Sequence, residues 1–155
     1  MRPAKERIVE KPPKIQGMKP MGVPGRLLEK ISLSIDEYEA IRLSDFEGMD
    51  HKASSEYMNI SRPTFTRLLQ SGHQKIADAI VNVKDLIIEG GNYSFTKILI
   101  RCLDCKAVSD IGAYHTDETL CPECNSTNVV CLNNVFQPGH CNRRRNFGGH
   151  GFRNQ

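Results

Sequence analysis

The sequence predicts two folded modules, a mainly α N-terminal domain with a three-helical, helix-turn-helix core and a small β-rich module like a zinc ribbon. Between residues 31 and 95, apolar residues recur at spacings of three and four, as on the buried face of an α-helix. Two Cys-x-x-Cys pairs follow among short β-favouring runs in residues 96–136. Residues 137–155 are rich in Gly, Arg and Asn and are expected to form a disordered basic tail.

Length and composition narrow the class of protein. A chain of 155 residues holds one or two domains, and 39% apolar residues are enough for a modest core. No apolar run approaches the roughly 20 residues that span a bilayer, and the charged, Pro-rich N-terminus is not typical of a secretory signal. We therefore expect a cytoplasmic protein with no membrane partner. In that compartment, six cysteines indicate metal or redox chemistry before disulfides.

The net charge of +3 conceals an asymmetry along the chain. Residues 1–30 have eight Lys and Arg against three Asp and Glu (net +5), residues 31–95 have six against ten (net −4), and residues 96–155 have seven against five (net +2). Five Pro and three Gly predict that residues 1–30 form a basic arm of loop or extended chain. Basic segments at both ends of the chain are equally consistent with nucleic-acid binding and with termini that are simply solvated.

Two short helices are expected first. Ser34 caps the first helix, and Glu37, three residues later, completes a capping box. Asp50 caps the second, which covers residues 51–58, and Asn59 suits the left-handed turn that follows it. The apolar face predicted for the first helix consists of Ile35, Tyr38, Ile41, Leu43 and Phe46.

A third helix is expected to begin at Ser61, which caps it, with Pro63 in the first turn, where a missing N–H does no harm. Its predicted core positions are Phe65, Leu68, Leu69, Gly72, Ile76 and Ile80. The opposite face is basic and polar, and no acidic residue occurs from Asn59 to Ala77. A helix that only faced solvent would be expected to mix charges of both signs.

This outward face predicts contact with double-stranded DNA. Arg and Gln side chains match the guanine and adenine edges of the major groove, and a helix N-terminus offers free N–H groups to a backbone phosphate. The residues predicted to contact DNA are Ser61, Arg62, Pro63, Thr64, Thr66, Arg67, Gln70 and Lys75. The competing interpretation is a generic three-helix core whose basic face is incidental.

Four segments carry a family resemblance: residues 36–43 (DEYEAIRL), 47–49 (EGM), 60–69 (ISRPTFTRLL) and 89–91 (EGG). The chain resembles a widespread bacterial and archaeal family of uncharacterised, predicted DNA-binding proteins over about residues 1–95. The resemblance implies a DNA-binding helix-turn-helix that is either winged or similar to region 4 of sigma factors. This sequence departs from the family pattern at a few positions. The family usually has Gly in place of Asn59, Ala-Ala in place of Ser54-Ser55, and often Gln or Glu in place of His51 and Lys52.

The second module is predicted from Cys102-Leu-Asp-Cys105 and, fifteen residues later, Cys121-Pro-Glu-Cys124. Two such pairs at this separation match a zinc ribbon, in which four thiolates lie about 2.3 Å from one metal. Residues 98–101 are expected to form the strand before the first pair, and Asn125 suits a left-handed turn after the second. Zn²⁺ is favoured because the segment is too small to fold without a metal. A rubredoxin-like iron or an iron–sulfur cluster is the alternative.

Three potential ligands lie outside this tetrad: Cys131, His140 and Cys141. They are open to three interpretations, as packing thiols, as a second labile metal site, or as cluster ligands of a redox sensor. His115, between the pairs, is expected to be a loop residue. The basic tail either adds salt-sensitive affinity for phosphate or is a solvated end without a role.

Nothing in the sequence is typical of an enzyme. It has no nucleophile elbow, phosphate loop or His-Glu-x-x-His motif, and a site with four thiolates has no open position for substrate. We therefore expect a transcriptional regulator that works as a homodimer, because a single recognition helix seldom supplies enough specificity. The alternatives are a metal- or redox-responsive module, and an adaptor that docks on RNA polymerase.

Overall fold

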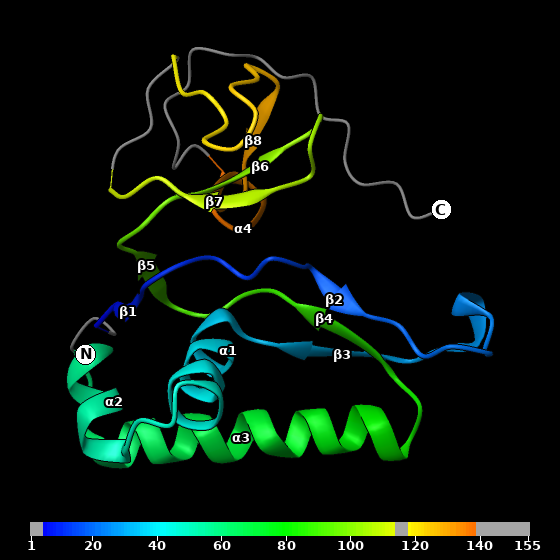
Figure 1. Cartoon of the computed structure of the whole chain (residues 1–155). Helices are drawn as coiled ribbons and strands as arrows, with labels where there is room; N and C mark the ends of the chain where they lie inside the picture. Colours follow the sequence, from blue (N-terminus) through cyan, green and yellow to red (C-terminus); the bar gives the residue numbers. More distant parts are fainter. Residues whose placement is uncertain (1–4, 114–117, 139–155) are drawn as a thin grey trace. The chain divides into compact units, whose positions relative to one another are not determined.

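A computed structural model of the chain describes residues 5–113 and 118–138. The chain divides into two compact units, of which the first ends at Thr96 and the second begins at Lys97. The first unit, blue to green in Figure 1, contains β1 (Arg7–Val9), β2 (Gly17–Met18), the 3-10 turn η1 (Gly25–Leu27), β3 (Lys30–Leu33), α1 (Ile35–Ile41), the π-helical turn η2 (Arg42–Phe46), α2 (His51–Tyr57), α3 (Arg62–Val81), β4 (Asp85–Ile88) and β5 (Tyr93–Phe95). The second contains β6 (Leu99–Cys102), β7 (Val108–Asp110), β8 (Val129–Cys131) and α4 (Asn133–Phe136). None of the described helices combines the length and apolarity needed to cross a bilayer.

Strands that are distant in sequence organise the first unit. β4 is the central strand of a three-stranded sheet, parallel to β3 and antiparallel to β2, while β1 pairs in parallel with β5. The long helix α3 packs against α1, α2, β3 and β4 (Figure 1). The unit is therefore mixed α/β, which corrects the prediction of a mainly α domain. Residues 7–9 and 17–18, within the expected arm, are strands.

The predicted helix starts are confirmed. Ser34 Oγ accepts a hydrogen bond from the Glu37 N–H at 3.3 Å, and Glu37 Oε2 accepts one from the Ser34 N–H at 2.9 Å. Asp50 Oδ1 lies 2.7 Å from the backbone nitrogen three residues on, and Ser61 caps α3 in the same manner. Asn59 has a φ of 57°, so the turn between α2 and α3 is left-handed as expected.

One apolar cluster holds the three helices together, and its buried members are Ala40, Leu43, Met58, Phe65 and Leu69. Two residues predicted to be buried are exposed instead. Phe46 is 83% exposed. It is the last residue of a π-helical turn, and the wider spacing of that turn directs its side chain away from the apolar face that includes Leu43. Ile80 is 74% exposed, because α3 is 20 residues long and continues beyond α1, which has seven.

Three buried carboxylates of α1 are each paired with a cation from another element: Asp36 with Arg7, Glu37 with Lys75 at 2.8 Å, and Glu39 with Arg42 at 2.7 Å. A buried carboxylate without a partner would be strongly destabilising, so each pair fixes α1 against the element that supplies the cation. Burial by itself raises the pKa of Glu37, but hydrogen bonds from Lys75, the Ser71 hydroxyl and a backbone N–H outweigh it. The pKa of Glu37 is therefore below its ordinary value.

The sheet of the second unit has β6 at its centre, antiparallel to both β7 and β8. Its apolar core is formed by Ile98 and Ile100. Asn133, at the start of α4, is fully buried, accepts a hydrogen bond from the Leu99 N–H at 3.0 Å and donates one to the Lys97 carbonyl at 2.9 Å. This side chain joins α4 to the beginning of β6.

Candidate nucleic-acid interface and metal centre

Four of the residues predicted to contact DNA lie together on the solvent side of α3. Arg62, Thr66, Arg67 and Gln70 are all exposed, and at 3.6 residues per turn they span an arc of about 140° opposite the buried Phe65. These four residues are termed the recognition face. Neither arginine forms an ion pair with any residue that the structure describes. Their charges are thus available to an external anion.

Three further predicted contacts lie in the first turn of α3. Ser61 Oγ accepts a hydrogen bond from the Thr64 N–H at 3.3 Å and lies 2.8 Å from Thr64 Oγ1. The two hydroxyls are therefore engaged with each other at the helix N-terminus. Pro63 is exposed between them and needs no partner, because it has no N–H.

His51, at the start of α2, reaches the recognition face from the neighbouring helix. Its Nδ1 lies 3.0 Å from Thr66 Oγ1, and its ring meets Phe65 edge-on, with centroids 5.4 Å apart. The contact fixes the orientation of the Thr66 hydroxyl. The sequence gives no sign of this link, since the two residues are fifteen positions apart and meet only once α2 packs on α3.

Lys75, predicted to contact DNA, is directed toward α1 instead. Its ammonium donates hydrogen bonds to both carboxylate oxygens of Glu37, at 3.0 and 2.8 Å, so we exclude it from the recognition face. An acidic side chain also approaches α3 from another element. Asp45 of η2 lies 2.6 Å from His73 Nε2. The segment from Asn59 to Ala77 has no acid of its own, but folding places a carboxylate beside its second half.

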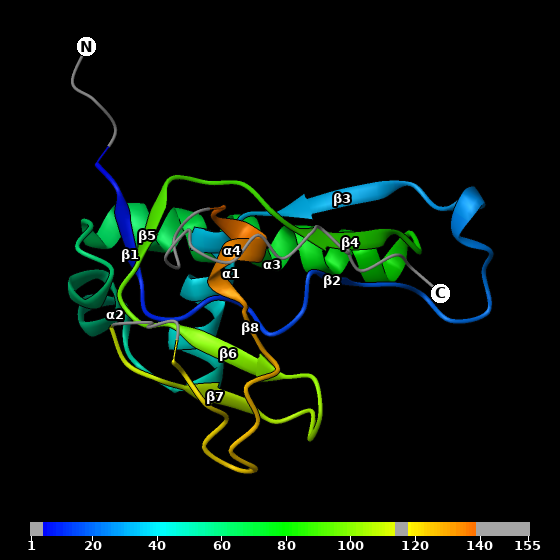
Figure 2. The ribbon, with the colours of Figure 1, turned by 90° about the horizontal axis from the view of Figure 1, so that it is seen from above.

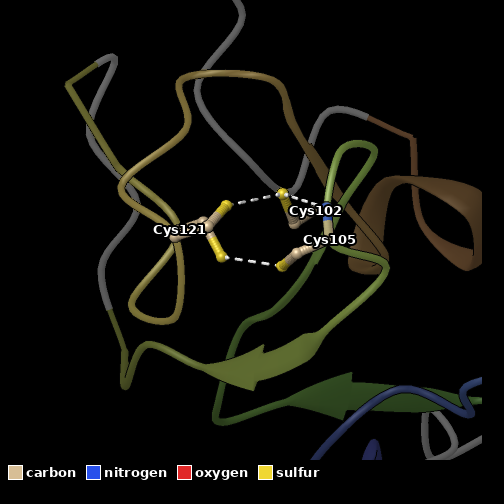
Figure 3. A group of neighbouring side chains, drawn as sticks. Cys102, Cys105 and Cys121 are labelled. Carbon is tan, nitrogen blue, oxygen red and sulfur yellow. Dashed lines mark hydrogen bonds between the residues drawn. The ribbon is translucent and has the colours of Figure 1, made fainter.

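The four cysteines of the two pairs converge on one point in the second unit. Their sulfur atoms all lie within 4.8 Å of one another, and Cys102–Cys124 and Cys105–Cys121 are 3.6 and 3.5 Å apart. Cys102, Cys105 and Cys121 are labelled in Figure 3. A tetrahedron with metal–sulfur bonds of about 2.3 Å has edges of about 3.8 Å, close to these separations. Four cysteines so arranged can hold a metal ion such as zinc.

Both Cys-x-x-Cys pairs form the same backbone turn. In each, the N–H of the first cysteine, Cys102 or Cys121, donates to the carbonyl five residues later, at 2.9 Å in both cases. The residue after the second cysteine is left-handed in each, with φ of 65° at Lys106 and 58° at Asn125. The turn at Asn125 is predicted by its residue type, whereas a lysine has no such preference and its turn follows only from the fold.

Backbone N–H donors and neighbouring thiols shift the pKa values of the clustered cysteines in opposite directions. The Cys105 N–H donates to Cys102 Sγ at 3.4 Å, and this hydrogen bond is the main reason that the pKa of Cys102 falls to about 7. At Cys124, a hydrogen bond from the Ser126 N–H lowers the pKa, but burial and the neighbouring thiols outweigh it and raise the pKa to about 12. Thiolates held this close repel one another, and a divalent cation among them offsets that repulsion.

Asp104 joins the two pairs. It lies between Cys102 and Cys105, and its carboxylate accepts hydrogen bonds from Ser126 Oγ and, at 3.2 Å, from Asn128 Nδ2. These two bonds, that from Ser126 first, lower the pKa of Asp104. The partners follow the second pair and are 22 and 24 positions away, so the sequence alone does not reveal the role of this residue.

Cys131 is separate from the four-cysteine cluster. It lies on β8 and packs against the apolar core of the second unit. His115, His140 and Cys141, like the tail from residue 139 onward, lie outside the described residues.

Known proteins resemble this chain along most of its length. A sequence profile described as "Protein of unknown function DUF134" matches residues 1–96. A UPF0251 protein of Chloroherpeton thalassium is 41% identical over 144 residues, which cover 93% of this chain and 95% of the relative. A UPF0251 protein of Desulforudis audaxviator is 35% identical over 148 residues, 96% of this chain and 94% of the relative. No solved structure matches significantly.

Proposed function

The chain belongs to the family of unknown function DUF134, and from its own side chains we propose that it is a sequence-specific DNA-binding protein, a transcriptional regulator that places the recognition face in the major groove. The observation that carries the proposal is the pair of exposed arginines, Arg62 and Arg67, which have no ion-pair partner among the described residues and flank Thr66 and Gln70. The alternative is an incidental basic face, and the Arg67 variant described below tests it.

The chemistry of the recognition face suits base edges. Arg pairs bidentately with guanine and Gln with adenine, and each good bidentate pair is worth about 1–3 kcal/mol of discrimination. His51 supports the arrangement because its contact with Thr66 holds one hydroxyl in place at 3.0 Å. One such face is small, so the proposal includes a homodimer that reads two half-sites. RNA polymerase is a partner only under the adaptor alternative.

Salt dependence is the first test of DNA binding. Fluorescence anisotropy on genomic fragments at several salt concentrations gives the slope of log affinity against log salt. About six phosphate contacts should give a slope of roughly −5. A slope near zero would contradict the proposal.

Sequence specificity is tested by replacing Arg67 with alanine. Loss of a bidentate contact is expected to weaken binding to the selected site by about 1–3 kcal/mol and to relax base preference at one position. The matched control is Lys19→Ala, which removes the same charge from an exposed residue outside α2 and α3. Sequencing of DNA selected by each variant gives the readout. Equal loss in both variants, with base preference unchanged, would contradict the assignment of the recognition face.

We also propose that the four cysteines hold one Zn²⁺ as the structural centre of the second unit. A separation of at most 4.8 Å suits four sulfurs around one ion, whereas an iron–sulfur cluster places several irons and sulfides between its cysteines. Elemental analysis is expected to give one zinc per chain, lost in Cys121→Ser and kept in the control Cys131→Ser, whose residue lies outside the cluster. Unchanged zinc in Cys121→Ser would dismiss the site.

A further inference from the structure

We infer that two copies of this chain associate through the end of the first unit formed by the β2–β3 connection and the last turn of α3. The inference rests on the proposed function only because recognition by a single helix calls for a dimer. The choice of surface rests on the exposed side chains.

Exposed apolar side chains are concentrated at this end of the unit. Of twelve large apolar side chains exposed among the described residues, half lie in the β2–β3 connection or at the end of α3. These six, termed the apolar end, are Met21, Val23, Leu27, Ile80, Val81 and Val83. Single exposed apolar residues are ordinary in a monomer, whereas a gathering of them indicates an interaction surface.

Backbone pairing brings the two segments together. Lys30 pairs with Asp85, and the Asp85 N–H donates to the Glu29 carbonyl at 2.8 Å. Lys84 Nζ lies 3.7 Å from the Glu29 carboxylate. The β2–β3 connection therefore returns to the sheet where the chain arrives from α3, and both views of the ribbon place these segments at one end of the unit (Figures 1 and 2).

The apolar end is large enough for a dimer. Its side chains are 36–97% exposed, and Ile80 and Val81 on α3 are 74% and 77% exposed. A side chain of this size has about 60–120 Å² of apolar surface, so the six together offer on the order of 350 Å². In an interface core that is about 65% apolar, this corresponds to on the order of 550 Å² per copy. The total then exceeds the roughly 1,000 Å² expected of a biological interface.

Charge around the apolar end favours a second copy as the partner. The charged residues that border it are of both signs: Arg26, Lys30, Lys84, Glu29 and Asp78. A two-fold axis brings the same surface of both copies face to face, so a rim of one sign would repel itself. Here Lys84 is paired with Glu29 and Asp78 within each copy, so the rim adds little repulsion between two copies. Because α3 spans about 30 Å, an interface at its C-terminal end leaves the recognition face near its N-terminal end free.

Sedimentation velocity of the full-length protein, without DNA, tests the interface. The wild type is expected to dimerise, and Ile80→Lys or Leu27→Lys to weaken dimerisation at least about a hundredfold, because a two-fold interface buries each new charge twice. Both side chains are exposed, so neither substitution should unfold the chain. Phe46→Lys is the matched control, since Phe46 is at least as exposed as Ile80 and Leu27 but is not part of the apolar end, and this variant should dimerise like the wild type.

The inference would be overturned by a wild type that stays monomeric at the highest attainable concentration, or by dimerisation that Ile80→Lys and Leu27→Lys leave unchanged. An equal loss in Phe46→Lys would also count against it. A dimer that depends on Ile80 but shows no salt-dependent DNA binding would support the interface and contradict only the proposed function. The two ideas can therefore fail separately.

Discussion

Replacing Ser54 with alanine is expected to stabilise the first unit. Ser54 is fully buried in α2, and its hydroxyl oxygen has no hydrogen-bond partner among the described residues. The hydroxyl has lost its contacts with water without gaining others, which is the situation in which a polar group reduces stability.

The size of the effect follows from the same contacts. An unsatisfied buried polar group costs about 1–3 kcal/mol, and alanine is also the better helix former by up to about 0.7 kcal/mol. Removing one oxygen leaves a small void that takes back part of this gain. A net stabilisation of about 1–2 kcal/mol is therefore expected for Ser54→Ala. In a unit of this size, that raises the midpoint of thermal unfolding by roughly 4–15 °C.

The neighbouring Ser55 is the matched control. It is also buried in α2, but its hydroxyl donates a hydrogen bond to the Lys52 carbonyl at 2.8 Å. Ser55→Ala makes the same chemical change and loses a bond worth about 0.5–1.5 kcal/mol, which cancels the gain in helix propensity. Thermal and urea unfolding, followed by circular dichroism at 222 nm, should therefore separate the two variants.

The reasoning would be refuted if Ser54→Ala were no more stable than the wild type. That result would mean that the Ser54 hydroxyl has a partner in solution, such as an ordered water or the carbonyl one helical turn earlier. Equal stabilisation in Ser55→Ala would refute it differently, since helix propensity alone would then account for both. Only a gain confined to Ser54 supports the argument from hydrogen bonding.

Three other substitutions test separate parts of the structure. Because folding lowers the pKa of Glu37, its contribution to the free energy of unfolding is present at neutral pH and is lost as pH falls below about 4.5. The stability of Glu37→Gln, measured by urea unfolding, should therefore respond less to acid than that of the wild type. An equal response would count against the pairing. Asp104→Asn should weaken zinc binding about tenfold in a chelator competition, and unchanged affinity would show that the link between the pairs is dispensable. Gly17→Ala should destabilise the first unit by about 1–3 kcal/mol, because the new Cβ would lie 2.2 Å from the Leu86 carbonyl oxygen. Gly25→Ala is the control, since a Cβ there has open space around it, and it should be neutral in the same unfolding assay.

Features set by neighbouring residues could be predicted from the sequence. The caps at Ser34, Asp50 and Ser61 depend on a side chain and a backbone N–H three residues apart, and all three are present. The strands could not be predicted in this way. β1 has three residues and β2 has two, too few to show alternation, and they are strands because they pair with residues 93–95 and 86–87.

The candidate site likewise has some features that the local sequence predicts and others that only the fold determines. The four cysteines are predictable, because the spacing within each pair is the chemical signal. The outward face of α3 is predictable from helical periodicity, but its far limit is not. Lys75 lies at the edge of that face, and only the packing of α1 decides that it turns to Glu37. Asp104 and His51 act on the two sites through partners that no local pattern identifies.

The distribution of charge in the first unit connects these observations. Residues 31–95 have a net charge of −4, which by itself argues against an affinity for DNA. Three of those acids, Asp36, Glu37 and Glu39, are buried in α1 beside cations, so their field at the surface is largely cancelled. Exposed charges act mainly within a screening length of about 8 Å, so an anion at the recognition face would meet Arg62 and Arg67 first. For the proposed DNA binding, the local sign of the charge on α3 therefore matters more than the net charge of the region.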